Sequence, residues 1–329
     1  MRIIRKSVAF VLAFSILSMT LGNTFVWGEF YEPDYECCCS DYDESVYLDY
    51  CPFPFEGDFT IAFDNFRSLP EGSYEGNTGA FASLNLATAV PFFSCHGFGV
   101  QLGSSYGVYD WSGRTSQIIG NNKEVQQQTF LTTGLFRRTP FCSGINFGLV
   151  YDWMFNDNFG EFALSPTLAQ FRFSGSYLFC CNNEFGLWGT VDTETAHKST
   201  EGIPVSFRAI SQINLFWQHY FANCANTVVW VGLPYKRSLM FSSGLAGRFI
   251  LGASFRVPLT ECLSIDGHAS YMRPKSIHGP TEANDYASNI CFGLTYSFGC
   301  SSKCIDKGFR PMMPVANNSN FISDTNINY

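Results

Sequence analysis

Hydrophobic and polar residues alternate along most of the chain after about residue 57. In residues 287–298, Ile290, Phe292 and Leu294 alternate with the small or polar residues Cys291 and Gly293. The same period recurs in residues 205–221 and 244–257. Successive side chains of a strand point to opposite faces, so a period of two predicts strands and does not fit helical spacing.

Twelve such segments follow one another, and most have ten residues or more. A soluble strand averages about 5–6 residues, whereas a tilted membrane-spanning strand needs about 9–11. The segments cover residues 57–67, 79–90, 97–109, 124–138, 143–155, 162–179, 184–193, 203–220, 226–235, 243–257, 262–272 and 287–298. The count stays open at two places: Pro166 could break one segment, and residues 319–329 alternate weakly and could add a strand.

The connections between these segments alternate in length. Short ones stand at residues 91–96, 139–142, 180–183, 222–226 and 258–261, and mostly longer, polar ones stand around 68–78, 110–123, 194–202 and 273–286. Short periplasmic turns and long outer loops are typical of outer-membrane barrels. The pattern therefore predicts an all-β fold, a transmembrane antiparallel up-and-down β-barrel of about 12 strands. With an even count, the segments before and after the barrel lie together on the short-turn side.

The start of the chain predicts export. A basic start, an apolar run at residues 7–21 and the small residues Val26 and Gly28 indicate a secretory signal peptide cleaved before Glu29. Residues 29–54 hold eight acids and no base, and they lack periodicity. We therefore expect four regions and an outer-membrane location: signal peptide 1–28, acidic cysteine-bearing periplasmic leader 29–54, barrel 55–299 and polar C-terminal tail 300–329.

Composition agrees with a barrel facing outer-membrane lipid. Only 15% of residues are charged while 46% are hydrophobic, whereas soluble domains carry about 25% charged residues. No later apolar run is long enough for a transmembrane helix. Three of the 20 basic residues lie in the signal, which leaves 17 against 28 acids and a net charge of −11. This acidic balance excludes nucleic acid as a partner.

Twelve of the 13 cysteines fall in the short turns or beyond the ends of the barrel. In an exported protein these are disulfide candidates: Cys37, Cys38, Cys39, Cys51, Cys95, Cys142, Cys180, Cys181, Cys224, Cys262, Cys300 and Cys304. Bonds within the chain, disulfide-linked self-association and bonds to periplasmic cysteine-rich partners all stay open. We expect no metal and no cofactor, because no histidine lies near the turn cysteines.

Cys291 is the exception, since it lies inside a predicted strand. Its place in the alternation turns it toward the lumen, and we expect it to be unpaired. A free thiol at a turn position would count against this register.

Charged residues on the polar faces of the strands are predicted to face the lumen. They are Arg172, Arg208, Arg248, Arg256, Asp152, Asp192 and Asp266. Such charges would set the selectivity of a pore, or they would pair with each other and fill a narrow barrel. Twelve strands lie between filled eight-stranded barrels and open porins. We favour a narrow aqueous pore.

One strand offers an enzymatic alternative. Asp266, His268 and Ser270 share a face, which resembles the His-x-Ser arrangement of outer-membrane phospholipases. In that family the site faces lipid, whereas the alternation turns His268 toward the lumen. A hydrolase also needs a base oriented by a third group. We therefore predict that the chain is not an enzyme.

Two motifs carry a family resemblance. The stretch QQQTFLTTGLFRR at residues 126–138, followed by GLVYDWM at 148–154, resembles an uncharacterised family of predicted outer-membrane β-barrel proteins of planctomycetes and chlamydia-like bacteria. The segments LFWQHYF and FRVPLTECLSIDGHASY fit the same pattern, so the resemblance covers roughly residues 57–298. That family implies a barrel and no activity. The cysteine-rich rim is similar, by analogy, to chlamydial-type major outer-membrane porins, whose disulfides strengthen an envelope poor in peptidoglycan.

The sequence thus predicts porin-like passage of small solutes, a disulfide-linked structural role in the cell envelope, or both. The alternatives are a structural or adhesive surface barrel with a plugged lumen, and an outer-membrane lipid hydrolase that uses His268 and Ser270.

Overall fold

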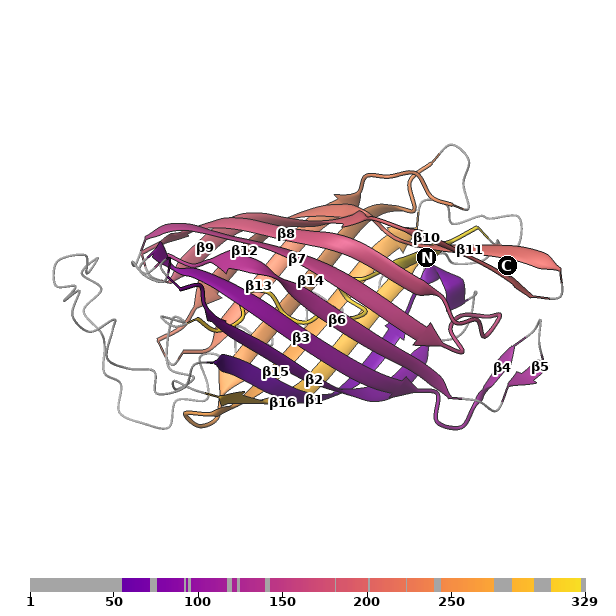
Figure 1. Cartoon of the computed structure of the whole chain (residues 1–329), viewed down its shortest axis with the longest axis horizontal. Coiled ribbons are helices and arrows are strands. Elements are labelled where there is room, and N and C mark those ends of the chain that lie inside the picture. The colour runs from indigo at the N-terminus through magenta and orange to yellow at the C-terminus, as the bar shows by residue number, and fades with distance from the viewer. Residues whose placement is uncertain are drawn as a thin grey trace.

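Twelve antiparallel strands close into one barrel, as predicted (Figure 1). The structure is a computed structural model that describes residues 55–71, 76–91, 93, 96–116, 120–122, 125–139, 143–180, 182–200, 202–222, 224–239, 244–274, 286–298 and 309–326. The barrel strands are β1 (Glu56–Arg67), β2 (Asn77–Ala89), β3 (Phe98–Tyr109), β6 (Gln126–Arg137), β7 (Gly144–Asp157), β8 (Thr167–Phe179), β9 (Asn183–Asp192), β12 (Gln212–Tyr220), β13 (Asn226–Pro234), β14 (Gly247–Pro258), β15 (Leu263–Pro274) and β16 (Ala287–Phe298). The first and last of these, β1 and β16, pair to close the barrel.

Alternation along the strands separates an apolar outer face from an interior. Phe63 on β1 and Leu215 on β12 are 69% and 65% exposed, while their neighbours Asp64 and Asn214 are buried. More than twenty further large apolar side chains stand exposed around the wall. Soluble monomers rarely expose contiguous apolar patches larger than a few hundred Å², so this band is suited to lipid.

The connections confirm the predicted asymmetry. The strand ends joined by the short connections 90–97, 138–143, 180–182, 221–225 and 259–262 lie at one end of the barrel, here called the short-turn end. The strand ends joined by the connections 68–76, 110–125, 158–166, 193–211, 235–246 and 275–286 lie at the other, the long-loop end. Within the described ranges, no helix is long and apolar enough to cross a membrane.

Residues 203–220 were predicted as one strand, and this was wrong. The structure breaks them into β11 (Ile203–Ala209), which pairs with β10 (Thr195–Thr200) in a hairpin, and the barrel strand β12. At the break, the Ile210 N–H donates to the carbonyl of Ile322, 2.7 Å away. One face of β11 is apolar and buried inside the protein. Its residues therefore alternate with the same period of two as those of a lipid-facing barrel strand, and the sequence pattern does not distinguish the two. A second small hairpin, β4 (Arg114–Ser116) and β5 (Gly120–Asn122), stands in another long loop.

The segment predicted at 162–179 begins later than expected. Strand β8 starts at Thr167, directly after Pro166. Proline has no backbone N–H to donate to a ladder, and the residues before it form a turn bridged between Phe159 and Leu164. Pro166 therefore marks the start of the strand and adds no extra one.

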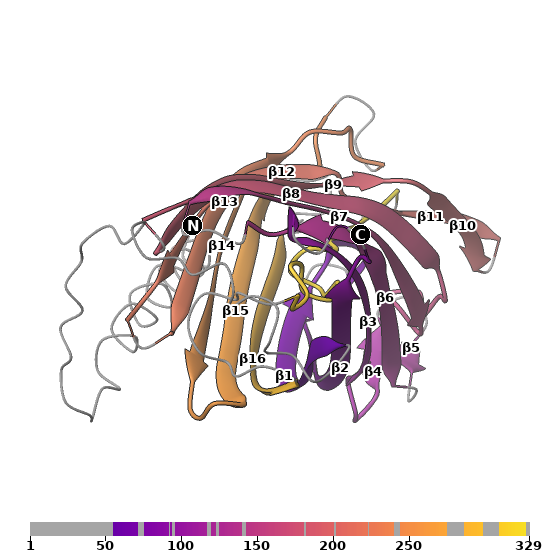
Figure 2. The ribbon, with the colours of Figure 1, turned by 60° about the vertical axis from the view of Figure 1, so that its left-hand side comes forward.

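Residues 309–326, here called the plug, run through the inside of the barrel (Figure 2). The tail was expected on the short-turn side, and this part of it instead reaches the long-loop end. There β17 (Ser323–Thr325) pairs with β11, close to the 3-10 turn η2 (Leu69–Glu71). Of the weakly alternating residues 319–326 that the structure describes, only these three form a strand. The rest of the plug is irregular backbone whose polar groups bond to the wall.

Candidate functional site

The candidate functional site is the lumen with the plug inside it. Near the short-turn end, the Arg310 guanidinium binds the Asp58 carboxylate at 2.5 Å and the Ser297 hydroxyl at 2.8 Å. The Phe309 N–H donates to a carboxylate oxygen of Glu56 (3.0 Å). Both acids point inward because they alternate with the exposed Phe59 and Phe55. The first plug residues are therefore held by β1 and β16.

Halfway along, wall side chains bond to the plug backbone. Gln101 on β3 makes two bonds with Met313, accepting from its N–H (3.1 Å) and donating to its carbonyl (2.8 Å). Thr132 on β6 accepts the N–H of Ala316 at 3.0 Å. The plug backbone is irregular and lacks the hydrogen bonds of a helix or sheet. Inward amide and hydroxyl groups of the wall pair with its N–H and C=O groups instead, as buried backbone requires.

A buried ion pair supports the same region. The Arg172 guanidinium on β8 binds both carboxylate oxygens of Asp152 on β7, at 2.9 and 3.1 Å. The Nη2 amino group, which makes the longer of these two bonds, also donates to the carbonyl of Pro314 at 2.7 Å. Both side chains are almost fully buried, with 3% and 0% exposure. A bidentate pair of this kind holds the two side chains in one relative orientation and also neutralises their charges.

Asn318 joins the plug to three strands. Its amide nitrogen lies 3.2 Å from a carboxylate oxygen of Asp64 on β1, 2.9 Å from the Gln128 amide oxygen on β6 and 3.4 Å from the hydroxyl of Tyr109 on β3. All four residues are buried.

At the long-loop end an apolar core closes the lumen. The plug residue Phe321 is 1% exposed, and its ring meets Phe130 at 5.9 Å between centroids. Val205 and Phe207 of β11 pack into the same core, with inward residues from β1, β3, β7 and β8. Ile322 enters a second, neighbouring core beside Leu69 and Ile250. Among the described residues, hairpin and plug together fill this end of the barrel.

Asp324 is a buried acid in the part of the plug that lies at the long-loop end. Its carboxylate accepts from the Ser238 hydroxyl (3.0 Å) and the Leu239 N–H (2.7 Å), and Arg208 lies 3.8 Å away. Burial, opposed by these partners, raises the pKa of Asp324 to about 6. The residue lies in β17, outside the membrane-spanning strands.

A cavity of about 440 Å³ remains between the plug and the wall. It lies toward the short-turn end, and its lining includes Asp58, Asn146, Arg172, Glu184, Arg256 and His268. The other side of the cavity is the plug itself, from Pro311 to Asn320. Charged and polar groups share this lining with apolar side chains such as Phe81, Trp188 and Phe216.

The structure places four of the seven predicted charges inside the barrel. Arg172 and Asp152 form the pair described above. Arg256 binds Asp266 at 2.6 Å and Asp58 at 3.5 Å. These interior charges pair with one another and, through Asp58, with Arg310 of the plug.

The other three stand near the long-loop end. Arg208 is not in the barrel wall, because β11 leaves the barrel, and it lies 3.8 Å from Asp192 at the end of β9. Asp192 also binds Lys236 at 2.6 Å. Arg248 is exposed and sits at a bulge that opens β14. The lumen placement of Arg208 and Arg248 is therefore corrected.

The sequence analysis missed several interior residues. Asp58, Asp64 and Glu184 alternate with exposed aromatic residues and could have been assigned to the lumen on that signal. Arg310 and Asn318 carry no such signal, because the plug has no periodicity.

The residues of the hydrolase alternative do not form a relay. Asp266 is bound by Arg256 at 2.6 Å, so it does not orient the imidazole of His268. Ser270 is 4% exposed, and His268 faces the lumen cavity, as the alternation predicted.

Four cysteines lie among the described residues. Cys180, Cys224 and Cys262 stand in short turns, as predicted, and Cys224 is disulfide-bonded. Cys262 and Cys291 carry free thiols, and Cys291 is buried on the inner face of β16. A free thiol at a turn was expected to count against the register. That inference was wrong, because the register holds while Cys262 is free. The other nine cysteines, the signal peptide and the leader lie outside the described residues.

Solved structures with likeness to the barrel include outer-membrane proteins. One is an outer membrane channel from Pseudomonas putida F1, at TM-score 0.48 and 8% identity over 78% of this chain and 100% of that one. KdgM porin follows at TM-score 0.40 and 7% identity over 73% and 99%. An outer membrane phospholipase from Salmonella typhi, described as a dimer with bound calcium, gives 0.39 and 10% over 78% and 94%. Likeness at this level carries no argument about what this chain does.

A search of curated proteins finds no match. A family model does match, over residues 57–323, and its description is a family of unknown function. The matched range contains both motifs on which the resemblance rested and extends through most of the plug. The bacterial groups associated with that resemblance stay a prediction. The chain therefore belongs to the family of unknown function DUF6666.

Proposed function

We propose that this chain is an outer-membrane barrel with a structural role in the cell envelope, closed by its own plug. The observation that carries the proposal is the plug itself. It bonds to the wall at three levels, through Arg310, Met313 and Asn318, and its far end lies in an apolar core. A constitutively open pore would need a continuous water path past these contacts.

The exposed band supports the membrane as the surrounding phase. Leu215 and Phe292 stand on strands whose inner faces are buried and polar. Removing that apolar area from water stabilises the protein by roughly 25 cal/mol per Å², so the wall favours lipid on every side. The predicted signal peptide agrees with export, and the short-turn end is assigned to the periplasm.

Conductance in planar bilayers tests closure. The full chain, reconstituted from detergent, is expected to give no resolved current steps. Regular steps like those of an open porin in the unmodified protein would overturn the proposal. Heat-modifiable mobility on electrophoresis confirms that the sample is folded.

Porin-like passage of small solutes is the second candidate, and one observation favours it. Only Ser323–Thr325 of the plug pairs as a strand, while the rest is held by side chains around a cavity of about 440 Å³ with a mixed polar and apolar lining. The plug is thus separable from the wall. Weakening it with Arg310→Ala and Asn318→Ala is expected to produce current steps if the barrel is a gated channel, and none if its role is purely structural. Ile213→Ala on the outer face is the matched control.

A disulfide-linked role adds a second test. Cys180 is exposed and Cys262 is half-buried, and both stand at the short-turn end. We propose that this rim bonds to neighbouring copies or to cysteine-rich periplasmic proteins. Non-reducing electrophoresis of envelopes is expected to show high-mass species that reducing agent removes and that Cys262→Ser diminishes. The buried Cys291→Ser is the control, and a monomer under both conditions would defeat this role.

A further inference from the structure

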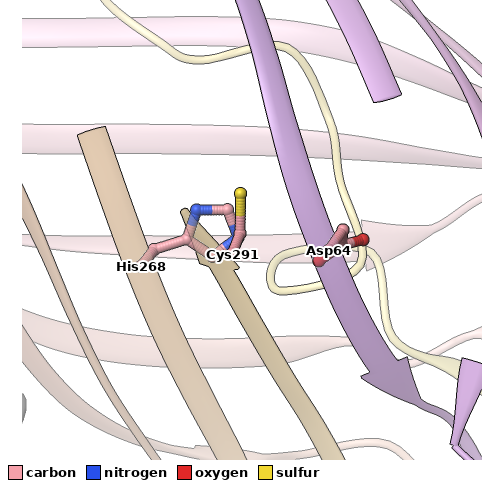
Figure 3. Close-up of side chains that lie close together, drawn as sticks. All are labelled: Asp64, His268 and Cys291. Atoms are coloured by element: carbon pink, nitrogen blue, oxygen red, sulfur yellow. The ribbon is translucent and has the colours of Figure 1, made fainter. Parts of the chain in front are cut away.

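Three potential metal ligands meet on the inner face of the barrel. Asp64 on β1 is the cross-strand partner of Cys291 on β16, which is in turn the partner of His268 on β15. Figure 3 shows the three side chains on their strands. Their ligand atoms, one from each residue, all lie within 4.8 Å of one another.

The donor set fits a thiophilic divalent ion. Zinc takes thiolate sulfur at about 2.3 Å, imidazole nitrogen at about 2.0–2.1 Å and carboxylate oxygen at about 2.0–2.2 Å, and sites with three protein ligands leave a fourth position open. Such bond lengths put ligand atoms roughly 3.5 Å apart around a tetrahedral ion. The three groups would therefore need to approach one another by up to about 1.3 Å to hold the ion.

A second observation points to a missing partner. The Nε2 atom of His268 is buried and makes no hydrogen bond of ordinary geometry among the described residues; the Asn289 amide faces the imidazole, and its Oδ1 makes none either. Leaving a buried polar atom unpaired is costly, so such an atom needs an explanation. A bound cation would satisfy the imidazole nitrogen.

The carboxylate is already oriented as a ligand would be. One oxygen of Asp64 accepts from the Tyr109 hydroxyl (3.0 Å) and the Asn318 amide (3.2 Å), and the other accepts from the Asn289 amide (2.5 Å). Hydrogen bonds of this kind fix metal-binding side chains and raise affinity. Asn318 belongs to the plug, so the site and the plug share a contact.

Nucleophilic chemistry fits this arrangement less well. In a Cys–His–Asp relay the imidazole stands between the thiol and the acid. Here the strand of Cys291 stands between those of His268 and Asp64, and Asp64 is bound by other donors. His268 and Cys291 also line the lumen cavity, which leaves room for a fourth ligand.

We propose that Asp64, His268 and Cys291 form a binding site for a divalent, thiophilic metal ion, with zinc as the best match, inside the barrel beneath the plug. Binding replaces the thiol proton of Cys291 with the ion and releases that proton to solvent. No metal was expected from the sequence, because no histidine lies near the turn cysteines. The proposed site instead uses Cys291, which lies in a strand. The proposal does not depend on whether the lumen conducts.

Cobalt titration of the folded full chain in detergent tests the site. Co²⁺ is expected to produce a thiolate-to-cobalt charge-transfer band with tetrahedral ligand-field bands, and Zn²⁺ is expected to abolish them. Cys291→Ser should lose the charge-transfer band and about one cobalt per chain. His268→Gln should weaken binding at least tenfold, and Asn318→Ala by about 10- to 100-fold. Cys262→Ser is the matched control, because it removes a free thiol outside the lumen site and should leave the cobalt bands unchanged.

A measurement on the unmodified protein covers the case in which a variant fails to fold. Zinc is expected to slow alkylation of Cys291 at least tenfold, read by peptide mass spectrometry, and to leave Cys262 unaffected. A folded protein that gives no cobalt band, a band that persists in Cys291→Ser, or equal protection of both thiols would overturn the proposal.

Discussion

Replacing Phe321 with alanine is expected to release the outer half of the plug without opening the wall. Phe321 is 1% exposed and packs in the apolar core beside Phe130 and Phe207. It belongs to no barrel strand. The loss should therefore fall on the docking of the plug.

The size of the effect follows from burial. Truncating a fully buried phenylalanine to alanine costs about 3–5 kcal/mol, because transfer free energy is lost and a cavity remains. Each 1.4 kcal/mol is a factor of ten. If the plug docks as its own cooperative unit, its opening equilibrium should shift by roughly two to three powers of ten.

Hydrogen exchange with mass spectrometry measures that shift. The N–H groups of Met313 and Ala316 are bonded to wall side chains, and in Phe321→Ala they should exchange about 10²- to 10³-fold faster, while peptides from the barrel strands keep their protection. Phe63→Ala, which truncates an outward side chain that is 69% exposed, should leave the plug unchanged. Unaltered plug exchange, or equal acceleration in the wall, would refute the reasoning.

Three further outcomes follow from single contacts. Burial raises the pKa of Asp324 from 3.8 to about 6, so the stabilisation of plug docking by Asp324 is complete below about pH 3.8 and is lost as the pH rises through about 6, an effect of order 3 kcal/mol. Asp324→Asn should remove this pH dependence. The measurement is the ratio of plug hydrogen-exchange rates in wild type and variant, compared at about pH 4 and about pH 7. Arg172→Ala leaves Asp152 buried without its ion-pair partner and should cost about 3–5 kcal/mol in urea unfolding, whereas replacing both with apolar residues should recover most of that loss; equal damage by both would show that the charge is not the cause. Leu215→Arg, on the outer face near the middle of β12, should reduce folding stability in lipid vesicles by about 2–4 kcal/mol, and no effect there would argue against lipid contact at that position.

The barrel was predictable because its alternation is a local property of the chain. Each strand must bury one face and expose the other, so residues such as Phe292 and Gly293 encode the wall by themselves. The break after Ala209 was not predictable. Val205 and Phe207 alternate as lipid-facing residues do, but they face a core that only the folded chain creates.

The interior was only half visible in the sequence. Polar residues at inward positions, such as Asp152 and Arg172, were assigned to the lumen by parity. The plug was not assigned to the lumen, because its irregular backbone bonds to side chains of the wall and such a segment has no periodic sequence pattern. The Asp64, His268 and Cys291 cluster arises from three strands paired in register, and that register depends on the closure of the barrel.

The position of Arg310 has a consequence for the order of assembly. Asp58 and Ser297, the two groups it binds, are direct cross-strand partners on β1 and β16, and they come together only when the last strand meets the first. Before that step, each edge strand offers Arg310 half of its binding site. The plug must then bridge contacts separated by more than 250 residues, which is slow because loop closure precedes the gain. Full docking of Arg310 therefore requires a joined seam, and a docked Arg310 marks a barrel that has closed.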